Sequence, residues 1–405
     1  MKKARCVIIC FIAIFLLLSC EPADYENLPQ EELYHLALGR MENQIDLFQF
    51  DKTSAYLKTS YYFKNGMYFI SNGPALKVMQ FNSYGDLMFL LYNPDVNPLP
   101  TSPSAENLEG QIADQKSRSY FFKGNGKIVV ASDNSLFIED QIPKEQIKMD
   151  EKLNVKLISR VLRFDRSGIL KDYIGQEGIG GSPFPYISDL FINHQDNLVV
   201  TSMVPGKKIL YWYKNDGNLL YNLSFDNSDL PKEGDLIPSL EKILVSYHED
   251  ILYLHIIFYE EVMNLQTQTR DTFDVSTSRL YKFNVRENRF VSFIELPKSD
   301  KLKIQNNNKT NLIPGPLYTV LGITEDDYVF LLRPELDEQN LLTILSPRGS
   351  VLGHRRITIE DSQLFYRELH LEAQGLITGL LGFDNYIKVV NWRGDKLLRE
   401  LIDEQ

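Results

Sequence analysis

Cysteine is nearly absent from this 405-residue chain. The three cysteines, Cys6, Cys10 and Cys20, all lie within the first twenty positions. The rest of the sequence therefore has no thiol for a disulfide, a thiolate zinc site or a cysteine nucleophile. Positive charge is also in deficit, with 43 Lys plus Arg against 54 Asp plus Glu. Nucleic-acid binding needs a basic surface, so we expect no nucleic-acid partner.

The apolar run at the start of the chain is too short for a permanent membrane span. Val7–Leu18 contains twelve consecutive apolar residues and follows Lys2, Lys3 and Arg5, whereas a spanning helix needs about 20. A basic start followed by a short apolar run is typical of an export signal. An uncleaved signal anchor is the alternative.

The run ends in Leu17-Leu18-Ser19-Cys20, which resembles the lipobox of bacterial lipoproteins. The resemblance implies that residues 1–19 are a signal peptide, removed before Cys20, and that Cys20 carries the lipid. Two or more acyl chains give stable attachment, so we expect a membrane-anchored, extracytoplasmic protein of the cell envelope. Because Glu21 follows the cysteine, the resemblance favours the outer membrane.

Residues 20–50 are interpreted as the lipidated cysteine and a tether. The tether is acidic, contains Pro22 and Pro29, and has room for one short helix. The segment 44–50 alternates apolar and polar residues, which predicts an extra strand.

A ten-residue pattern recurs six times after the tether. It has an aliphatic second position, an apolar fifth position, a turn-forming sixth position in five copies and Gly at the ninth position in five copies. The copies are 77–86, 160–169, 209–218, 279–288, 341–350 and 386–395. Each copy predicts a strand that ends in a type I turn closed by a left-handed residue, followed by a second strand.

Another pair of β-rich runs precedes each copy, so each unit has four antiparallel strands. Six such units over 51–405 predict an all-β fold, a six-bladed β-propeller, rather than a sandwich pair or a solenoid. The last unit offers all four of its strands, so the ring can close without strand exchange; the alternative is that segment 44–50 adds to an exposed edge. The predicted blades are approximately 55–92, 119–175, 186–226, 240–297, 317–358 and 366–402.

One stretch, residues 173–220, resembles an NHL-type repeat. The resemblance rests on Gly175, Gly178, Gly180 and Gly181, then Phe184, Pro185, Ile187 and Asn197. It implies a six-bladed propeller that serves mostly as a binding platform, although some relatives of this type are metal-dependent lyases or lactonases.

The long connections map to one face of the predicted propeller. The turns between strands one and two and between strands three and four of every blade are short, whereas the insertions 92–118, 139–157, 260–278 and 297–316 all join the other strand ends. Loops on a rigid scaffold commonly carry recognition. Because 139–157 and 260–278 carry charges of both signs, we expect a polar protein partner there.

The sequence offers no catalytic constellation. It contains no G-x-S-x-G elbow, H-E-x-x-H motif or phosphate loop. The cluster His248-Glu249-Asp250, with His255 beyond it, is interpreted as a solvated turn, and His194 as a surface residue. Asp189 is the single weak candidate for a calcium ligand, because no ring of carboxylates emerges. We expect no catalytic residue, no cofactor and no bound metal.

These observations favour a binding or scaffold module that recognises a protein or envelope component through the face with the long loops. A calcium-dependent hydrolase or lyase acting in the central channel is the alternative from another class. A structural subunit of an envelope assembly machine is a third.

Overall fold

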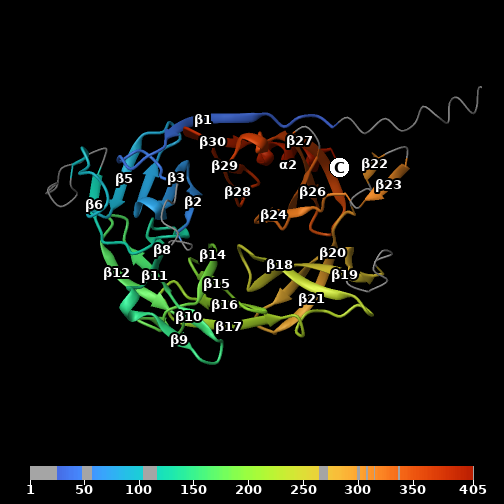
Figure 1. Cartoon of the computed structure of the whole chain (residues 1–405), viewed down its shortest axis with the longest axis horizontal. Coiled ribbons are helices and arrows are strands. Elements are labelled where there is room, and N and C mark those ends of the chain that lie inside the picture. Colours follow the sequence, from blue (N-terminus) through green and yellow to red (C-terminus); the bar gives the residue numbers. More distant parts are fainter. Residues whose placement is uncertain are drawn as a thin grey trace, which may run out of the picture.

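The computed structural model describes residues 25–47, 57–103, 116–263, 272–298, 302–306, 309–313, 315–335 and 338–404. It confirms the predicted all-β fold, a six-bladed propeller of four-stranded antiparallel blades. Figure 1 shows the blades as a ring that is traversed in chain order, with the innermost strands around the centre. Among the residues described, no helix has the length and apolar character needed to cross a membrane.

The first three blades are continuous in sequence, and their strands run from the channel outward in chain order. Blade 1 contains β2 (Thr59–Lys64), β3 (Met67–Asn72), β4 (Lys77–Phe81) and β5 (Leu87–Tyr92); blade 2 contains β7 (Ile128–Val130), β8 (Leu136–Gln141), β11 (Ser159–Phe164) and β12 (Leu170–Gly175); blade 3 contains β14 (Tyr186–Ile192), β15 (Leu198–Val204), β16 (Lys207–Tyr213) and β17 (Leu219–Asp226). The short strands β6 (Lys116–Ser119) and β13 (Gly178–Ile179) extend blades 1 and 2 at their outer edges.

The remaining blades follow the same plan, except for the outermost strand of the last blade. Blade 4 contains β18 (Ile237–Val245), β19 (Ile251–Val262), β20 (Thr272–Asn284) and β21 (Arg289–Glu295); blade 5 contains β24 (Thr319–Ile323), β25 (Val329–Pro334), β26 (Gln339–Leu345) and β27 (Val351–Thr358); blade 6 contains β28 (Tyr366–Leu371), β29 (Ile377–Gly382), β30 (Tyr386–Trp392) and β1 (Gln30–Ala37). Two hairpins stand outside the blades, β9 (Lys148–Asp150) with β10 (Val155–Leu157) and β22 (Leu302–Asn306) with β23 (Lys309–Ile313), as do the short 3-10 helices η1 (Gly73–Ala75), η2 (Lys144–Gln146) and η3 (Asp361–Gln363).

In blades 1 to 5 the recurring ten-residue pattern forms the predicted tight turns between the outer two strands, whereas in blade 6 a helix begins at its Gly394. In blade 2 the Asp165 carboxylate accepts hydrogen bonds from the N–H groups of Ser167 and Ile169, and Gly168 has φ of 76°. A left-handed φ favours glycine because it has no Cβ. Where glycine is missing, in blade 4, Asn288 takes the left-handed conformation with φ of 49°.

Six apolar clusters hold the ring together, one at each contact between neighbouring blades. Trp212 contributes to the cluster between blades 3 and 4, and Trp392 to the cluster between blades 5 and 6; both are fully buried. Most of the abundant strand aromatics therefore pack between blades, where aromatic side chains bury large areas.

The predicted mode of ring closure is wrong. β1 comes from the segment interpreted as a tether, and it pairs antiparallel with β30 from Gln30 opposite Trp392 to Ala37 opposite Tyr386. The N-terminal strand therefore completes the C-terminal blade, as Figure 1 shows at the outer edge of the ring. A propeller with an unpaired β30 would expose backbone hydrogen-bonding groups at an edge, and β1 satisfies them.

Two local predictions fail with it. Residues predicted to form the last strand instead form α2 (Gly394–Asp403), because β1 already covers β30; Leu397, Leu398 and Leu401 recur at helical spacing and are buried against blades 5 and 6. The strand expected at 44–50 is not formed in the part that is described: Ile45 makes only an isolated bridge with Leu38, and 48–50 lie outside the described residues.

We predict that substituting the buried side chain of β1 destabilises the whole ring. Leu36 is 4% exposed and packs in the cluster between blades 1 and 6, so Leu36→Ala should lower the free energy of unfolding by about 2–4 kcal/mol in urea titrations. Glu31→Ala, at an exposed position of the same strand, should change it by less than about 0.5 kcal/mol. Equal midpoints for Leu36→Ala and wild type would contradict closure by β1.

Candidate functional site

Lysine side chains cross the central channel of the ring. The Lys58 ammonium, just before β2 of blade 1, donates to the carbonyl oxygen of Ile187 in blade 3 at 2.5 Å and to Glu139 of blade 2 at 2.8 Å. Blades 1 and 3 are not neighbours, so this contact passes across the channel. The Tyr186 ring, whose centroid is 4.1 Å from the same ammonium, adds a cation–π contact.

A second lysine joins three blades at the channel. Lys127, just before β7 of blade 2, lies 3.7 Å from an Asp189 oxygen in blade 3 and 3.6 Å from a Glu368 oxygen in blade 6. The Asp189 carboxylate raises the pKa of Lys127 above its usual range. Burial alone would raise the pKa of Glu368, but its hydrogen bond with His370 and the charge of Lys127 lower it overall. The network therefore favours charged, mutually neutralised groups.

Asp189, the sequence candidate for calcium, does face the channel from β14. Its nearest charged neighbour is the Lys127 ammonium, which lies between the Asp189 and Glu368 carboxylates. Calcium requires six to eight oxygen ligands and tolerates no ammonium in its shell. The residues around Asp189 therefore fit an internal ion pair better than a calcium site.

The long insertions all lie on one face, which we call the long-loop face: the face with the connections between blades and between the second and third strands of each blade. It carries the 93–127 connection, the β9–β10 hairpin, the β22–β23 hairpin and the outer ends of β19 and β20, which are 12 and 13 residues long. On the opposite, short-turn face, the turns between consecutive strands are two to five residues long in the described blades.

Large apolar side chains are exposed on these insertions. Met149 on β9 is 54% exposed, and Met263 and Phe273, at the ends of β19 and β20, are 54% and 52% exposed. Charged residues of both signs surround them, among them Lys148 and Glu260. Aromatic and methionine side chains beside charges are typical of the surfaces through which proteins bind one another.

The short-turn face brings together residues that are distant in sequence. His194, in the turn after β14, and His248, in the turn after β18, stack with ring centroids 4.5 Å apart. Glu325, in the turn after β24, lies 3.5 Å from the His194 imidazole. His255 does not join them: it is buried in β19 and hydrogen-bonds Ser278.

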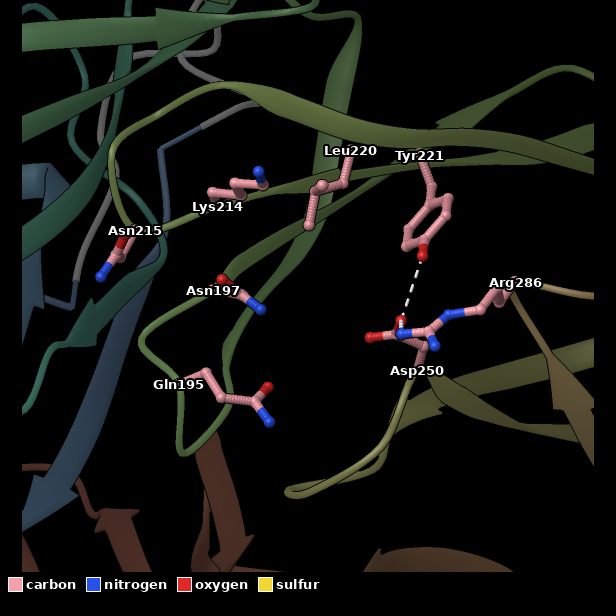
Figure 2. A pocket seen from close by; sticks show the side chains of 8 residues that line it. All are labelled: Gln195, Asn197, Lys214, Asn215, Leu220, Tyr221, Asp250 and Arg286. Carbon is pink, nitrogen blue, oxygen red and sulfur yellow. Dashed lines mark hydrogen bonds and ion pairs between the residues drawn. The ribbon is translucent and has the colours of Figure 1, made fainter.

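A polar cavity of about 380 Å³ opens on the same face, between blades 3 and 4. Figure 2 shows its lining, in which the Tyr221 hydroxyl donates to Asp250 at 3.0 Å and Arg286 pairs with the same carboxylate at 2.9 Å. The other lining residues are Gln195, Asn197, Lys214, Asn215 and Leu220. The cavity uses the turns that also carry His194 and His248.

The sequence motifs did not predict the channel network. Lys58 and Lys127 immediately precede the inner strands β2 and β7, and no motif singles out Glu368. The alternation Glu368-Leu-His370-Leu-Glu372 does carry a signal for this network. Alternate residues of a strand share one face, so the pattern predicts three titratable side chains on one face of this inner strand. No local sequence motif predicts that His194, His248 and Glu325 lie together, since each comes from a different blade.

We predict that Glu372 makes folding stability depend on pH. Burial raises the pKa of this carboxyl to about 8, and the Thr378 hydroxyl bond offsets part of the effect. In the unfolded chain the group ionises near its ordinary pKa of 4.5. Between these values the folded state holds a proton that the unfolded state has lost, so stability falls as pH rises.

Glu372→Gln should remove that contribution. Its free energy of unfolding relative to wild type should increase as the pH rises from about 4.5 to about 8 and then level off, in urea titrations over a pH series. The matched control is Glu249→Gln, because Glu249 is exposed and, like Glu372, lies in a turn of the short-turn face. Its free energy of unfolding should have the same pH dependence as that of the wild type. A Glu372→Gln profile parallel to wild type would contradict the raised pKa.

Comparisons with known proteins extend no further than the fold. No protein-family model matches the chain, and no curated protein matches it. Among solved structures, a streptogramin B lyase is 8% identical over 90% of this chain and 98% of its own, with a TM-score of 0.37. Regucalcin from Agrobacterium tumefaciens, a calcium-binding protein, is 11% identical over 85% and 93%, with a TM-score of 0.39. A DUF4221-family member from Bacteroides vulgatus is 11% identical over 91% and 98%, with a TM-score of 0.40. Likenesses this remote carry no argument about activity.

Proposed function

We propose that this protein is an extracytoplasmic lipoprotein, anchored through Cys20, whose propeller binds a protein or envelope component through the long-loop face. The observation that carries the proposal is the asymmetry of the ring. Every extended connection in the described residues lies on the long-loop face, and the short-turn face carries tight turns. Insertions gathered on one face of a rigid scaffold support a recognition role for that face.

The channel network supports binding over channel catalysis. Two carboxylates that could serve as general bases or metal ligands, Glu139 and Asp189, are engaged with Lys58 and Lys127. A reaction in the channel would have to break these pairs, and removing one partner of a buried pair is costly. A calcium-dependent hydrolase or lyase is therefore the less favoured alternative.

The position of Tyr25 and Leu28 constrains how an anchored propeller would stand on a membrane. Tyr25 packs on His354 of blade 5, with ring centroids 4.9 Å apart, and the Leu28 N–H donates to the Arg356 carbonyl at 2.8 Å. The five residues from Cys20 to Tyr25 span at most about 18 Å when fully extended. A lipid on Cys20 would hold the rim at blade 5 beside the bilayer and leave the long-loop face open at the side.

We predict that partner binding depends on the exposed apolar residues of the long-loop face. The double variant Met149→Asp with Phe273→Asp should lower recovery of a cross-linked partner from envelope membranes at least about tenfold, or about 1.4 kcal/mol. The matched control is Tyr84→Asp with Ile169→Asp, two exposed residues of the short-turn face, which should leave recovery unchanged. Quantitative mass spectrometry of the captured proteins measures both. Equal recovery from the two double variants would contradict a role for the long-loop face.

We predict that blade 5 lies nearer the lipid surface than blade 2, its opposite in the ring. Arg348→Cys and Arg166→Cys place a fluorophore at exposed positions in equivalent turns of these blades. In vesicles with a headgroup-attached quencher, the label at 348 should be quenched several-fold more than the label at 166, because the tether is about 18 Å at most.

The anchor itself has a separate readout. Cys20→Ala should abolish palmitate incorporation and leave residues 1–19 attached, which raises the mass of the chain. Palmitate incorporation in the Cys20→Ala protein, or none in the wild type, would contradict lipid anchoring. Equal quenching at 348 and 166 in the lipidated protein would contradict the edge-on orientation alone.

A further inference from the structure

Three neighbouring turns of the short-turn face present two imidazoles and a carboxylate to one point. The His194 and His248 rings are nearly parallel, at 5°, with centroids 4.5 Å apart, and His194 Nε2 is 3.5 Å from Glu325 Oε2. All of their candidate ligand atoms lie within 4.8 Å of one another. In the part of the chain that the structure describes, this is the one group of three or more metal-ligating side chains so arranged.

The backbone that carries these residues is fixed by hydrogen bonds between blades. The His194 N–H donates to the Tyr247 carbonyl at 3.0 Å, and the Gln195 side chain donates to the His248 carbonyl at 3.1 Å. The Glu325 N–H donates to the Ala373 carbonyl of blade 6 at 2.7 Å. The His194 and His248 turns are therefore tied to each other, the Glu325 turn is tied to blade 6, and both imidazoles are exposed.

The donor set selects the class of ion. Two imidazole nitrogens and one carboxylate oxygen suit zinc and similar divalent transition metals, whereas calcium and magnesium prefer all-oxygen shells. Zinc bonds of about 2.0–2.1 Å place tetrahedral ligand atoms about 3.3 Å apart. The distances between the ligand atoms of His194, His248 and Glu325 would reach that spacing if the side chains moved by about 1 Å. Exposed side chains can make such a movement by a small change of rotamer.

We propose that His194, His248 and Glu325 form a site for one zinc-class divalent cation at the short-turn face. Three protein ligands leave a coordination position for water or another ligand. The same turns line the polar cavity of Figure 2 through Gln195 and Asp250, so the cation would lie next to a pocket for a polar molecule. The site is on the face opposite the proposed partner surface and is independent of it.

Metal titration of the full chain carrying Cys6→Ser, Cys10→Ser and Cys20→Ala tests the proposal, since this variant has no thiol and no affinity tag is used. Calorimetry with zinc should give one ion per chain, and cobalt should give a visible absorption band at the same stoichiometry. His194→Ala with His248→Ala should weaken zinc binding at least about a hundredfold, and Glu325→Gln at least about tenfold.

The matched control is His35→Ala, because His35 is an exposed histidine of β1 with its own carboxylate partner, Glu32, at 2.9 Å. It should bind zinc as wild type does, and all variants should keep the wild-type melting temperature. Zinc binding that survives the double histidine variant would overturn the proposal. So would an equal loss in His35→Ala, or calcium binding as tightly as zinc at the same residues.

Discussion

The antiparallel pairing of β1 with β30 is the constraint on which the architecture depends. It joins a strand from the beginning of the chain to the last blade, so the ring closes through seven backbone-paired positions rather than through side-chain packing alone. A neighbouring contact reinforces it: the buried Lys77 ammonium of blade 1 donates to the Met41 carbonyl at 2.6 Å, just after β1. The N-terminal segment is therefore tied to blades 5, 6 and 1 together.

This closure also explains the C-terminal helix and the site of attachment. Because β1 occupies the outer edge of β30, the residues after Trp392 have no strand to pair with, and their leucines are buried instead by α2. The same strand directs the chain that precedes it along the rim of blade 5, where Arg356 and Leu28 are paired. The pairing of β1 with β30 thus determines both how the last blade ends and which part of the ring would lie next to a lipid anchor.

The sequence predicted what is local and repeated. The Asp165–Gly168 turn and its four relatives in blades 1, 3, 4 and 5 recur at fixed positions in a pattern, and a repeated hairpin implies a repeated blade. The sequence did not predict contacts between blades. The acidic segment that contains Gln30–Ala37 lacks the ten-residue pattern, and its strand conformation depends on pairing with the distant edge of β30. The Lys127 ion pairs depend equally on the curvature of the ring, which places blades 2, 3 and 6 around one point.

The channel, the short-turn face and the long-loop face carry different sets of side chains. Inside the channel, ammonium groups neutralise carboxylates, so Lys58 and Lys127 stabilise the ring where inner strands with like-charged carboxylates would repel one another. At the short-turn face the turns converge, and His194, His248 and Glu325 have no lysine among the contacts that join them. At the long-loop face the connections include hairpins such as β9–β10, which stand outside the blades. The proposed ion site and the proposed partner surface therefore lie on opposite faces of the ring and use different residues.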